Sequence, residues 1–322
     1  MERKITYAQA INEAITEEMN RDPRVFMMGE DLRGRPSLWK GKPLDELFGD
    51  RIINTPISEP GFVGASLGAA LTGMRPIVQL MFVDLAFVAM DQIANQVAKC
   101  RYMSGGQSKV PLVIMAPEGA SGMAAAQHSQ SLEGLFIHIP GLKVVVPFTP
   151  YDVKGLLKTA IRDDDPVIFL THKRLLASKG SVPEEEYLIP FGEGTVKREG
   201  DDVTIVAWLY TLKKSLAAAE KLEEEGISVE VIDPRTLVPF DGKAVLESVK
   251  KTGRLVIAQE ECKRGGAAAE VAAFVAEEGF DYLKSPIKRV ASEDVPIPYA
   301  KVMEDFVILQ VEDIIKAIKE IL

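Results

Sequence analysis

Residues 54–73 read Asn-Thr-Pro-Ile-Ser-Glu-Pro-Gly-Phe-Val-Gly-Ala-Ser-Leu-Gly-Ala-Ala-Leu-Thr-Gly. The stretch joins one carboxylate, Glu59, to a run of small residues that begins at Gly61. Glycine inside a helix costs about 1 kcal/mol relative to alanine, so a role in packing or binding must offset that cost. We therefore expect a helix from Gly61 whose backbone closely approaches another backbone or a ligand.

Short apolar runs alternate with helical patterns on both sides of this stretch. The runs are rich in branched residues and do not alternate with polar ones, which is typical of parallel strands covered on both faces. The strands predicted in the first half are Val25–Met28, Ile52–Asn54, Ile77–Phe82, Leu112–Met115, Lys143–Val146 and Val167–Leu170. The helices predicted there, besides the one from Gly61, run from Thr6 to about Asn20, from about Val83 to Tyr102, and onward from Thr149-Pro150.

The same alternation returns after a polar, proline-marked stretch at 179–194, which we take as the domain boundary. The predicted strands of the second half are Val203–Ala207, Val229–Ile232, Leu255–Ala258 and Ile287–Val290, with helices near Leu212–Glu225, Ala267–Glu278 and Val311–Ile321. The sequence thus predicts an α/β protein of two domains, residues 1–186 with a mainly parallel sheet and a smaller α/β domain at 187–322.

The bulk composition excludes several classes of protein. The 322 residues carry 47 acidic and 38 basic side chains, a formal net charge of −9, without a basic cluster that would follow a phosphate backbone. We expect no nucleic-acid partner. Two cysteines, Cys100 and Cys262, are too few for a disulfide framework, and no apolar run is long enough to span a membrane. A cytoplasmic protein without a membrane partner is the resulting expectation.

Gly64-Ala-Ser66-Leu-Gly68 matches the Gly-x-Ser-x-Gly pattern of serine hydrolases, with His128 as a possible base. That pattern requires a strand directly before the serine and a sharp turn at it. Here the serine lies within a predicted small-residue helix, so helix packing is the better interpretation. The chain also lacks a Gly-x-Gly-x-x-Gly loop and a Walker loop, and therefore a phosphate cradle of its own.

Glu59 and His128 each follow a predicted strand. Ligands of open α/β sheets bind outside the carboxyl ends of the strands, so both residues are candidates for chemistry. His128 lies in a loop of small and polar residues, 119–131, after the strand Leu112–Met115. Taken alone, Glu59 could also be a carboxylate that interacts with the dipole of the helix it precedes.

Several segments, taken together, resemble one family in order and spacing. The family is the beta subunit of the thiamine-diphosphate-dependent, decarboxylating component of 2-oxoacid dehydrogenase complexes, of pyruvate and acetoin dehydrogenase type within the transketolase-like superfamily. The matching segments are 54–73, Met81-Phe-Val-Asp84, 91–96, 101–106, Gln127-His-Ser-Gln-Ser-Leu132, 140–147, 161–166, Val231-Ile-Asp-Pro-Arg-Thr-Leu237 and Pro296-Ile-Pro-Tyr299. The resemblance implies a transketolase-like pyrimidine-binding domain followed by a transketolase C-terminal-like domain.

The resemblance also assigns roles around the cofactor. The family's glutamate falls on Glu59, which would hydrogen-bond N1′ of the aminopyrimidine and favour the imino tautomer that deprotonates the thiazolium ring. Met81 and Leu85 would pack on the aminopyrimidine; position 85 is often aromatic in the family, so here only apolar contact is expected. His128 matches the active-site histidine, which would orient substrate or intermediate or assist transfer to a lipoyl group.

The resemblance explains why this chain has no phosphate-binding loop of its own. Diphosphate and Mg²⁺ would be held by a Gly-Asp-Gly motif of an alpha subunit, giving an alpha-two, beta-two heterotetramer with thiamine diphosphate shared between chains. The second domain would help to pair beta subunits and contact the lipoyl acyltransferase. A K⁺ ion, bound by some family members, would have as its ligands Leu112, Ala160, Ile161, Asp163 and Asp165.

We expect a small-molecule substrate. The segments Met81–Asp84 and His128–Leu132 look like the acetoin and pyruvate branches of the family rather than the branched-chain one.

Two further hypotheses about the function stay open. One is a subunit that mainly docks the alpha chain and the acyltransferase, which the departures at Pro60 and Leu85 allow. The other is a serine hydrolase that uses Ser66.

Overall fold

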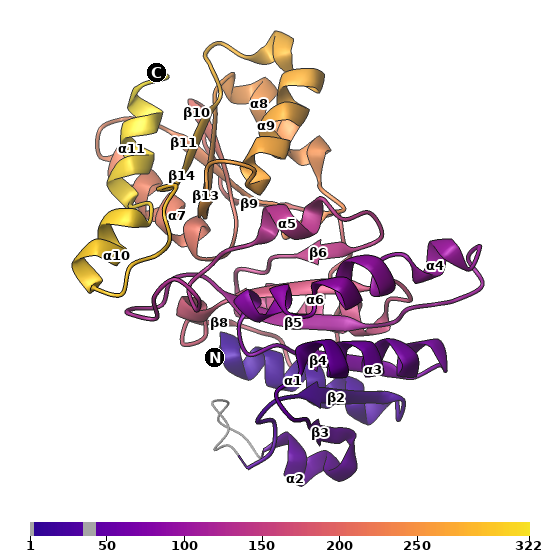
Figure 1. The fold of residues 1–322 in the computed structure, drawn as a ribbon. Coiled ribbons are helices and arrows are strands. Elements are labelled where there is room, and N and C mark those ends of the chain that lie inside the picture. The colour runs from indigo at the N-terminus through magenta and orange to yellow at the C-terminus, as the bar shows by residue number, and fades with distance from the viewer. Residues whose placement is uncertain (1–2, 35–42) are drawn as a thin grey trace. The chain divides into compact units, whose positions relative to one another are not determined.

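The computed structural model describes residues 3–34 and 43–322. The chain divides into two compact units, one made of residues 1–118 and 136–191 and the other of residues 119–135 and 192–322. Figure 1 shows the course of the chain through both. The segment 119–135, which carries His128, thus belongs to the unit formed mainly by the C-terminal part of the chain. The predicted domain division at 186/187 stays a prediction.

A parallel sheet forms the centre of the first unit. Its strands lie in the order β6-β7-β5-β4-β2-β3, and every neighbouring pair is parallel. The bounds are β2 Val25–Gly29, β3 Ile52–Asn54, β4 Arg75–Gln79, β5 Val113–Glu118, β6 Lys143–Val145 and β7 Val167–His172. The strand cores are buried, as expected for apolar runs covered on both faces. All six predicted strands are present, although β4 begins and ends earlier than predicted.

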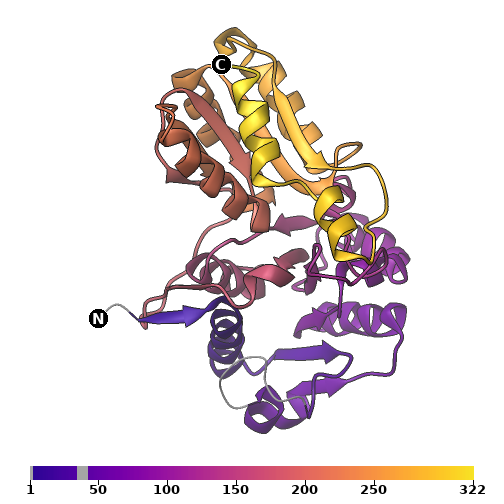
Figure 2. The ribbon, with the colours of Figure 1, turned by 90° about the vertical axis from the view of Figure 1, so that its left-hand side faces the viewer.

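Helices cover both faces of this sheet (Figures 1 and 2). Helices α1 and α6 pack against each other, and α3 packs on β4 and on residues 91–97. Thr6 and Thr149 cap α1 and α6 with capping boxes, which confirms both predicted helix starts. The bounds are α1 Tyr7–Arg21, α2 Leu44–Phe48, η1 Gly49–Arg51, α3 Glu59–Leu71, η2 Val83–Phe87, η3 Asp91–Val97, α4 Cys100–Met103, α5 Glu133–Ile137, α6 Pro150–Arg162 and η4 Lys173–Leu175.

One prediction for the first unit is wrong. Residues 83–102 do not form one long helix but a 3₁₀ segment (η2), a π-helical segment (η3) and a short α-helix (α4). An apolar repeat of three to four residues cannot distinguish turns of three, 3.6 or more than four residues, because all three place similar positions on one face. The sequence pattern also gave no sign of the antiparallel pair β1 Lys4–Thr6 and β8 Lys179–Ser181.

The second unit contains a five-stranded sheet in the order β14-β13-β10-β11-β9. Its strands are parallel except for the edge strand β9, which was not predicted. Helices α7 and α11 lie on one side of the sheet, with α8 and α9 on the other (Figure 1). The bounds are β9 Thr195–Arg198, β10 Val203–Ala207, α7 Leu209–Glu223, β11 Val229–Asp233, β12 Thr236–Val238, α8 Gly242–Thr252, β13 Leu255–Cys262, α9 Ala267–Glu278, η5 Phe280–Tyr282, β14 Lys288–Ser292, α10 Lys301–Val307 and α11 Val311–Lys319. The two-domain α/β fold with mainly parallel sheets is confirmed.

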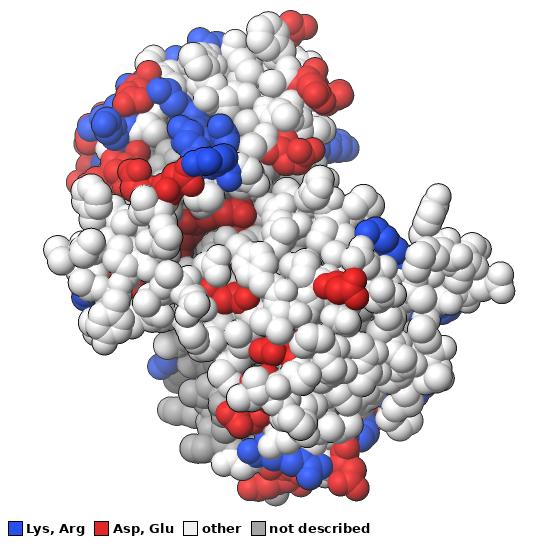
Figure 3. Space-filling model, viewed as in Figure 1, with Lys and Arg blue, Asp and Glu red and all other residues white. Residues whose placement is uncertain are grey.

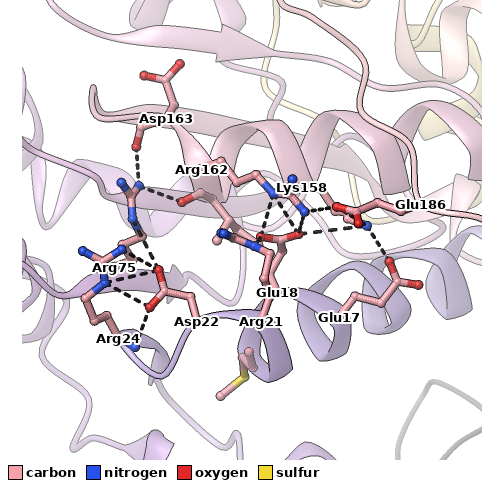
Figure 4. A network of polar contacts seen from close by, with 12 residues as sticks. Glu17, Glu18, Arg21, Asp22, Arg24, Arg75, Lys158, Arg162, Asp163 and Glu186 are labelled. Carbon is pink, nitrogen blue, oxygen red and sulfur yellow. Dashed lines mark hydrogen bonds and ion pairs between the residues drawn. The ribbon is translucent and has the colours of Figure 1, made fainter.

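Charged side chains on the face shown in Figure 3 are interspersed, with basic groups beside acidic ones and large uncharged areas between them. Within the first unit, a network of ion pairs joins α1 to α6 (Figure 4). Glu18, which is fully buried, lies 2.6 Å from Arg162 and 2.7 Å from Arg21. Among residues 3–34 and 43–322, no helix combines the length and apolar character needed to cross a membrane.

Candidate active site

Glu59 is the first residue of α3 and follows β3 at the carboxyl edge of the first unit's sheet. Its exposed fraction is only 5%, yet among the described residues no donor to its carboxylate is found. A buried carboxylate without a donor is unfavourable unless a bound group completes it. The helix dipole at this terminus favours a negative charge, but it does not by itself account for so enclosed a position.

A second carboxylate, Glu30, lies near Glu59. Glu30 directly follows β2, the strand that pairs with β3, so both acids leave the same edge of the sheet. Burial raises the pKa of Glu30, and the negative charges of Glu59 and Asp31 raise this pKa further. The sequence prediction missed Glu30, although its place after a predicted strand is the same signal that identified Glu59. Two neighbouring acids at this edge can attract a group that carries positive charge or hydrogen-bond donors.

A mainly apolar cavity of about 190 Å³ lies at the same edge within the first unit. Met81, one of the predicted cofactor contacts, lines it together with Glu30 and Gln79. Its remaining lining comes from α1, α2, the strands β2, β3, β5 and β7, and neighbouring loops, with Met27, Ile52 and Met115 among the apolar members. Leu85 lies half-buried on η2 and does not line this cavity, and neither does Glu59.

His128 lies exposed in the segment 119–135 of the second unit. Its backbone N–H donates to the carbonyl of Ala125 at 3.3 Å. Glu59 and His128 therefore belong to different units, and the sequence prediction that both serve one site remains a prediction.

Buried carboxylates of the second unit surround this segment, and the sequence prediction did not include them. Glu261 accepts hydrogen bonds from the backbone N–H groups of Gly134 at 3.0 Å and Ala267 at 2.9 Å. Burial raises the pKa of Glu261 to about 8, with a further contribution from the charge of Glu133. Glu133, 1% exposed, accepts from the indole Nε1–H of Trp208 at 2.7 Å. The Glu260-Glu261 pair at the end of an apolar strand was the available signal.

The predicted K⁺ ligands lie around the turn after α6. The carbonyl oxygens of Ile161 and Asp163 both accept from Nη1 of Arg75, at 3.0 and 2.9 Å (Figure 4). The carboxylates of Asp163 and Asp165 pair with Lys143 at 2.6 and 3.2 Å. A K⁺ ion here would therefore depend on carbonyl oxygens, since internal cations neutralise the carboxylates. The carbonyls of Leu112 and Ala160 accept backbone N–H groups of Val167 and Asp163.

Ser66 is fully buried in the middle of α3, and its hydroxyl donates a hydrogen bond to the sulfur of Met28 at 3.7 Å. The exposed nucleophile on a strand-to-helix turn that a serine hydrolase needs is not formed. The packing interpretation of this serine is the better one.

Comparisons with known proteins agree with this two-part organisation. Residues 3–179 match the transketolase pyrimidine-binding domain, and residues 192–314 match the transketolase C-terminal domain. The beta subunit of acetoin:2,6-dichlorophenolindophenol oxidoreductase from Cupriavidus necator is 50% identical, over 96% of this chain and 94% of that one. The chain belongs to this family of dehydrogenase beta subunits.

Other relatives widen the range of named substrates. The pyruvate dehydrogenase E1 component subunit beta from Rickettsia felis is 46% identical over 99% of this chain and 98% of its own length. The 2-oxoisovalerate dehydrogenase subunit beta of Bacillus subtilis is 43% identical over 98% of each chain. A solved split-gene transketolase, an inactive beta4 tetramer, shares the fold with a TM-score of 0.80 at 26% identity, over 98% of both chains. The predicted family is thereby confirmed for this beta subunit.

Proposed function

We propose that this beta subunit supplies half of a thiamine-diphosphate site at which a 2-oxoacid or acetoin is cleaved, with an alpha chain supplying the other half. The observation that carries the proposal is the largely buried side chain of Glu59, to which no described residue donates a hydrogen bond. Such a carboxylate suits a ring nitrogen that can share a proton with it. Thiamine diphosphate, when bound, supplies the carbanion chemistry that this cleavage requires.

The residues at the carboxyl edge of the first sheet fit the aminopyrimidine end of that cofactor. Glu59 would hold a proton at N1′ of the ring, and Met81 would provide apolar contact. Leu85 would add contact from η2, although the structure gives it no place in the Met81 cavity. Burial raises the pKa of Glu30, and the negative charges of Glu59 and Asp31 raise it further, so a second perturbed acid lies beside Glu59.

His128 would orient the carbonyl or carboxylate of the substrate, or assist passage of the acyl group to a lipoyl group. An imidazole ring can do either, because one of its ring nitrogens can donate a hydrogen bond while the other accepts one. Its exposure is compatible with a role toward a substrate that arrives from solution or with a lipoyl arm.

The partners follow from the family and from this chain's lack of a phosphate-binding loop. We propose an alpha-two, beta-two heterotetramer in which the alpha chain holds Mg²⁺ and the diphosphate. The lipoyl acyltransferase would receive the acyl group, and the cytoplasm is the proposed location. K⁺ would bind, if present in the assembly buffer, through the carbonyls of Leu112, Ala160, Ile161, Asp163 and Asp165.

The proposed substrate is acetoin or pyruvate rather than a branched-chain 2-oxoacid. The segments Met81–Asp84 and 127–132 resemble the first two branches, and the relatives named for acetoin and pyruvate are 50% and 46% identical against 43% for 2-oxoisovalerate. Dye reduction by the co-expressed alpha–beta pair with each of the three compounds tests this ranking.

The central experiment is Glu59→Gln, measured as substrate-dependent dye reduction with the alpha chain present. A proton-transfer group contributes about 10²–10⁴-fold, so we expect a loss of at least about 100-fold. The variant should still co-purify with the alpha chain. Retained turnover would instead support a subunit that only docks its partners, since docking does not depend on the charge of Glu59.

A further inference from the structure

The loop that carries His128 is closed on itself and conformationally strained. The N–H of Gly119 donates to the carbonyl of Gln130 at 2.9 Å, which brings the two ends of the segment together. Within it, Met123 and Ala125 have φ angles of +56° and +60°. This conformation is unfavourable for an L-residue and persists only where the surroundings impose it.

Packing alone does not impose this conformation on the whole loop. A cavity of about 330 Å³ lies against its second half within the same unit. Ser129 and Ser131 line this cavity, and no described residue hydrogen-bonds their hydroxyl groups. The part of the loop that follows His128 therefore borders open space rather than a close-packed wall.

Two buried carboxylates of the C-terminal part of the chain hold the first half of the loop. Glu260 on β13 accepts the N–H of Ala120 at 2.6 Å, and Glu304 on α10 accepts the N–H of Met123 at 2.8 Å. Their exposed fractions are 7% and 0%. A hydrogen bond to a buried carboxylate can offset backbone strain, and the one to Glu304 acts directly on Met123.

The far end of the segment is fixed as well. Glu261 accepts the N–H of Gly134, and a Cβ built on Gly134 would come within 2.4 Å of the carbonyl oxygen of Gly265. Only glycine fits this close approach. A displacement of the backbone at residue 134 would break its contact with Gly265 and its hydrogen bond to Glu261. The strained stretch between the anchors is thereby confined to the residues around His128.

We propose that Glu260 and Glu304 are positioning residues that hold the His128 loop in its working conformation. This inference rests on the proposed role of His128. When the bond from Met123 to Glu304 is lost, Met123 can relax to a negative φ, and the backbone that leads to His128 five residues later changes direction. The effect of Glu304 on turnover therefore passes through His128.

A double-mutant cycle of kcat in the alpha–beta complex tests this route. We expect His128→Ala to lower kcat by about 100-fold and Glu304→Ala by about tenfold. The double variant should be no slower than His128→Ala alone, because a displaced loop cannot misplace an imidazole that has already been removed. Losses that multiply in the double variant would overturn the proposal.

Glu230→Ala is the matched control. Glu230 is 2% exposed, lies in the same unit, and accepts from Lys251 and from the backbone N–H of Gly200, which is not part of the His128 loop. Its loss should lower stability without the tenfold effect on kcat. An equal fall in kcat for Glu230→Ala and Glu304→Ala would mean a purely structural role and would reject the inference.

Two further measurements keep the test decisive. Glu304→Gln fills the same space with a weaker acceptor, so we expect it to lower kcat by less than Glu304→Ala does. This loss should also be absent when His128 is already alanine. Glu304→Gln replaces Glu304→Ala in the test if the Glu304→Ala chain does not assemble. Amide hydrogen exchange in the complex should speed up across 119–130 in Glu304→Ala but not in Glu230→Ala. Full turnover by His128→Ala would reject the role of His128 itself, independently of the Glu59→Gln result.

Discussion

The acidic side chains of the first unit fall into two kinds of surroundings. Between α1 and α6, and in the turn at 163–165, carboxylates pair with Lys or Arg, as Glu18 does with Arg162 and Asp163 does with Lys143. At the carboxyl edge of the sheet, Glu30 instead faces the negative charge of Glu59, and its pKa is raised. Paired acids stabilise the fold, whereas acids that face one another are left for a ligand to complete.

The strongest test of this difference is to neutralise one paired acid, Glu18, and one acid that faces another acid, Glu59. Glu18→Gln leaves Arg162 without its buried partner, so we expect a loss of about 3 kcal/mol and a fall in melting temperature of roughly 5 °C or more. Glu59→Gln removes a charge that repels Glu30 and should leave the melting temperature unchanged or slightly higher. Thermal unfolding of each variant, co-purified with the alpha chain, measures both.

Catalysis should respond in the opposite order. Turnover per folded molecule should be normal in Glu18→Gln and lost in Glu59→Gln. If Glu59→Gln destabilised the protein as much as Glu18→Gln, Glu59 would be a structural acid and the division between the two regions would fail.

The same contrast marks what the sequence could predict. The strands, and the position of Glu59 after one of them, were predictable because a parallel strand and its carboxyl end are local patterns, read from a few consecutive residues. Glu30 obeyed the same rule but belonged to no motif. The helical subtype of residues 83–102 was not predictable, since hydrogen-bond spacing is not encoded in apolar spacing.

The contacts that surround His128 were even harder to predict from the sequence. Its loop is held by Glu261, Glu260 and Glu304, which are 127, 140 and 181 positions away from the amides they accept. No local pattern links such residues, and only the folded chain brings them together. The assignment of residues 119–135 to the second unit has the same cause.

A pH effect is expected from the Glu133 and Glu261 pair, the second place where acids face one another. Because the pKa of Glu261 is raised to about 8, the folded chain keeps a proton that the unfolded chain loses above a pH of about 4.5. Stability should therefore fall as pH rises through this window and level off above pH 8. Melting temperatures between pH 5 and 9 should show this slope in the native chain and a flatter one in Glu261→Gln. Parallel curves for the two chains would mean that Glu261 titrates normally.

The smallest expected effect tests whether the paired turn at 163–165 also binds K⁺. The Arg75 guanidinium uses one lone pair on each of the carbonyls of Ile161 and Asp163, and each oxygen retains a second. An affinity on the order of 10 mM would raise stability by about 1.4 kcal/mol in about 100 mM K⁺. We therefore expect a higher melting temperature in KCl than in NaCl or choline chloride at equal ionic strength.

Comparing the three salts distinguishes binding of K⁺ at this turn from general screening of its ion pairs. Screening of the ion pairs of Asp163, Asp164 and Asp165 acts equally in all three chlorides, because it depends on ionic strength alone. Only a bound ion of the right size distinguishes K⁺ from Na⁺ at carbonyl oxygens. Identical melting temperatures in the three salts would show that the turn uses only cationic side chains of this chain, namely Arg75, Arg101, Lys109 and Lys143. The turn would then be a wholly structural counterpart to the edge that carries Glu59.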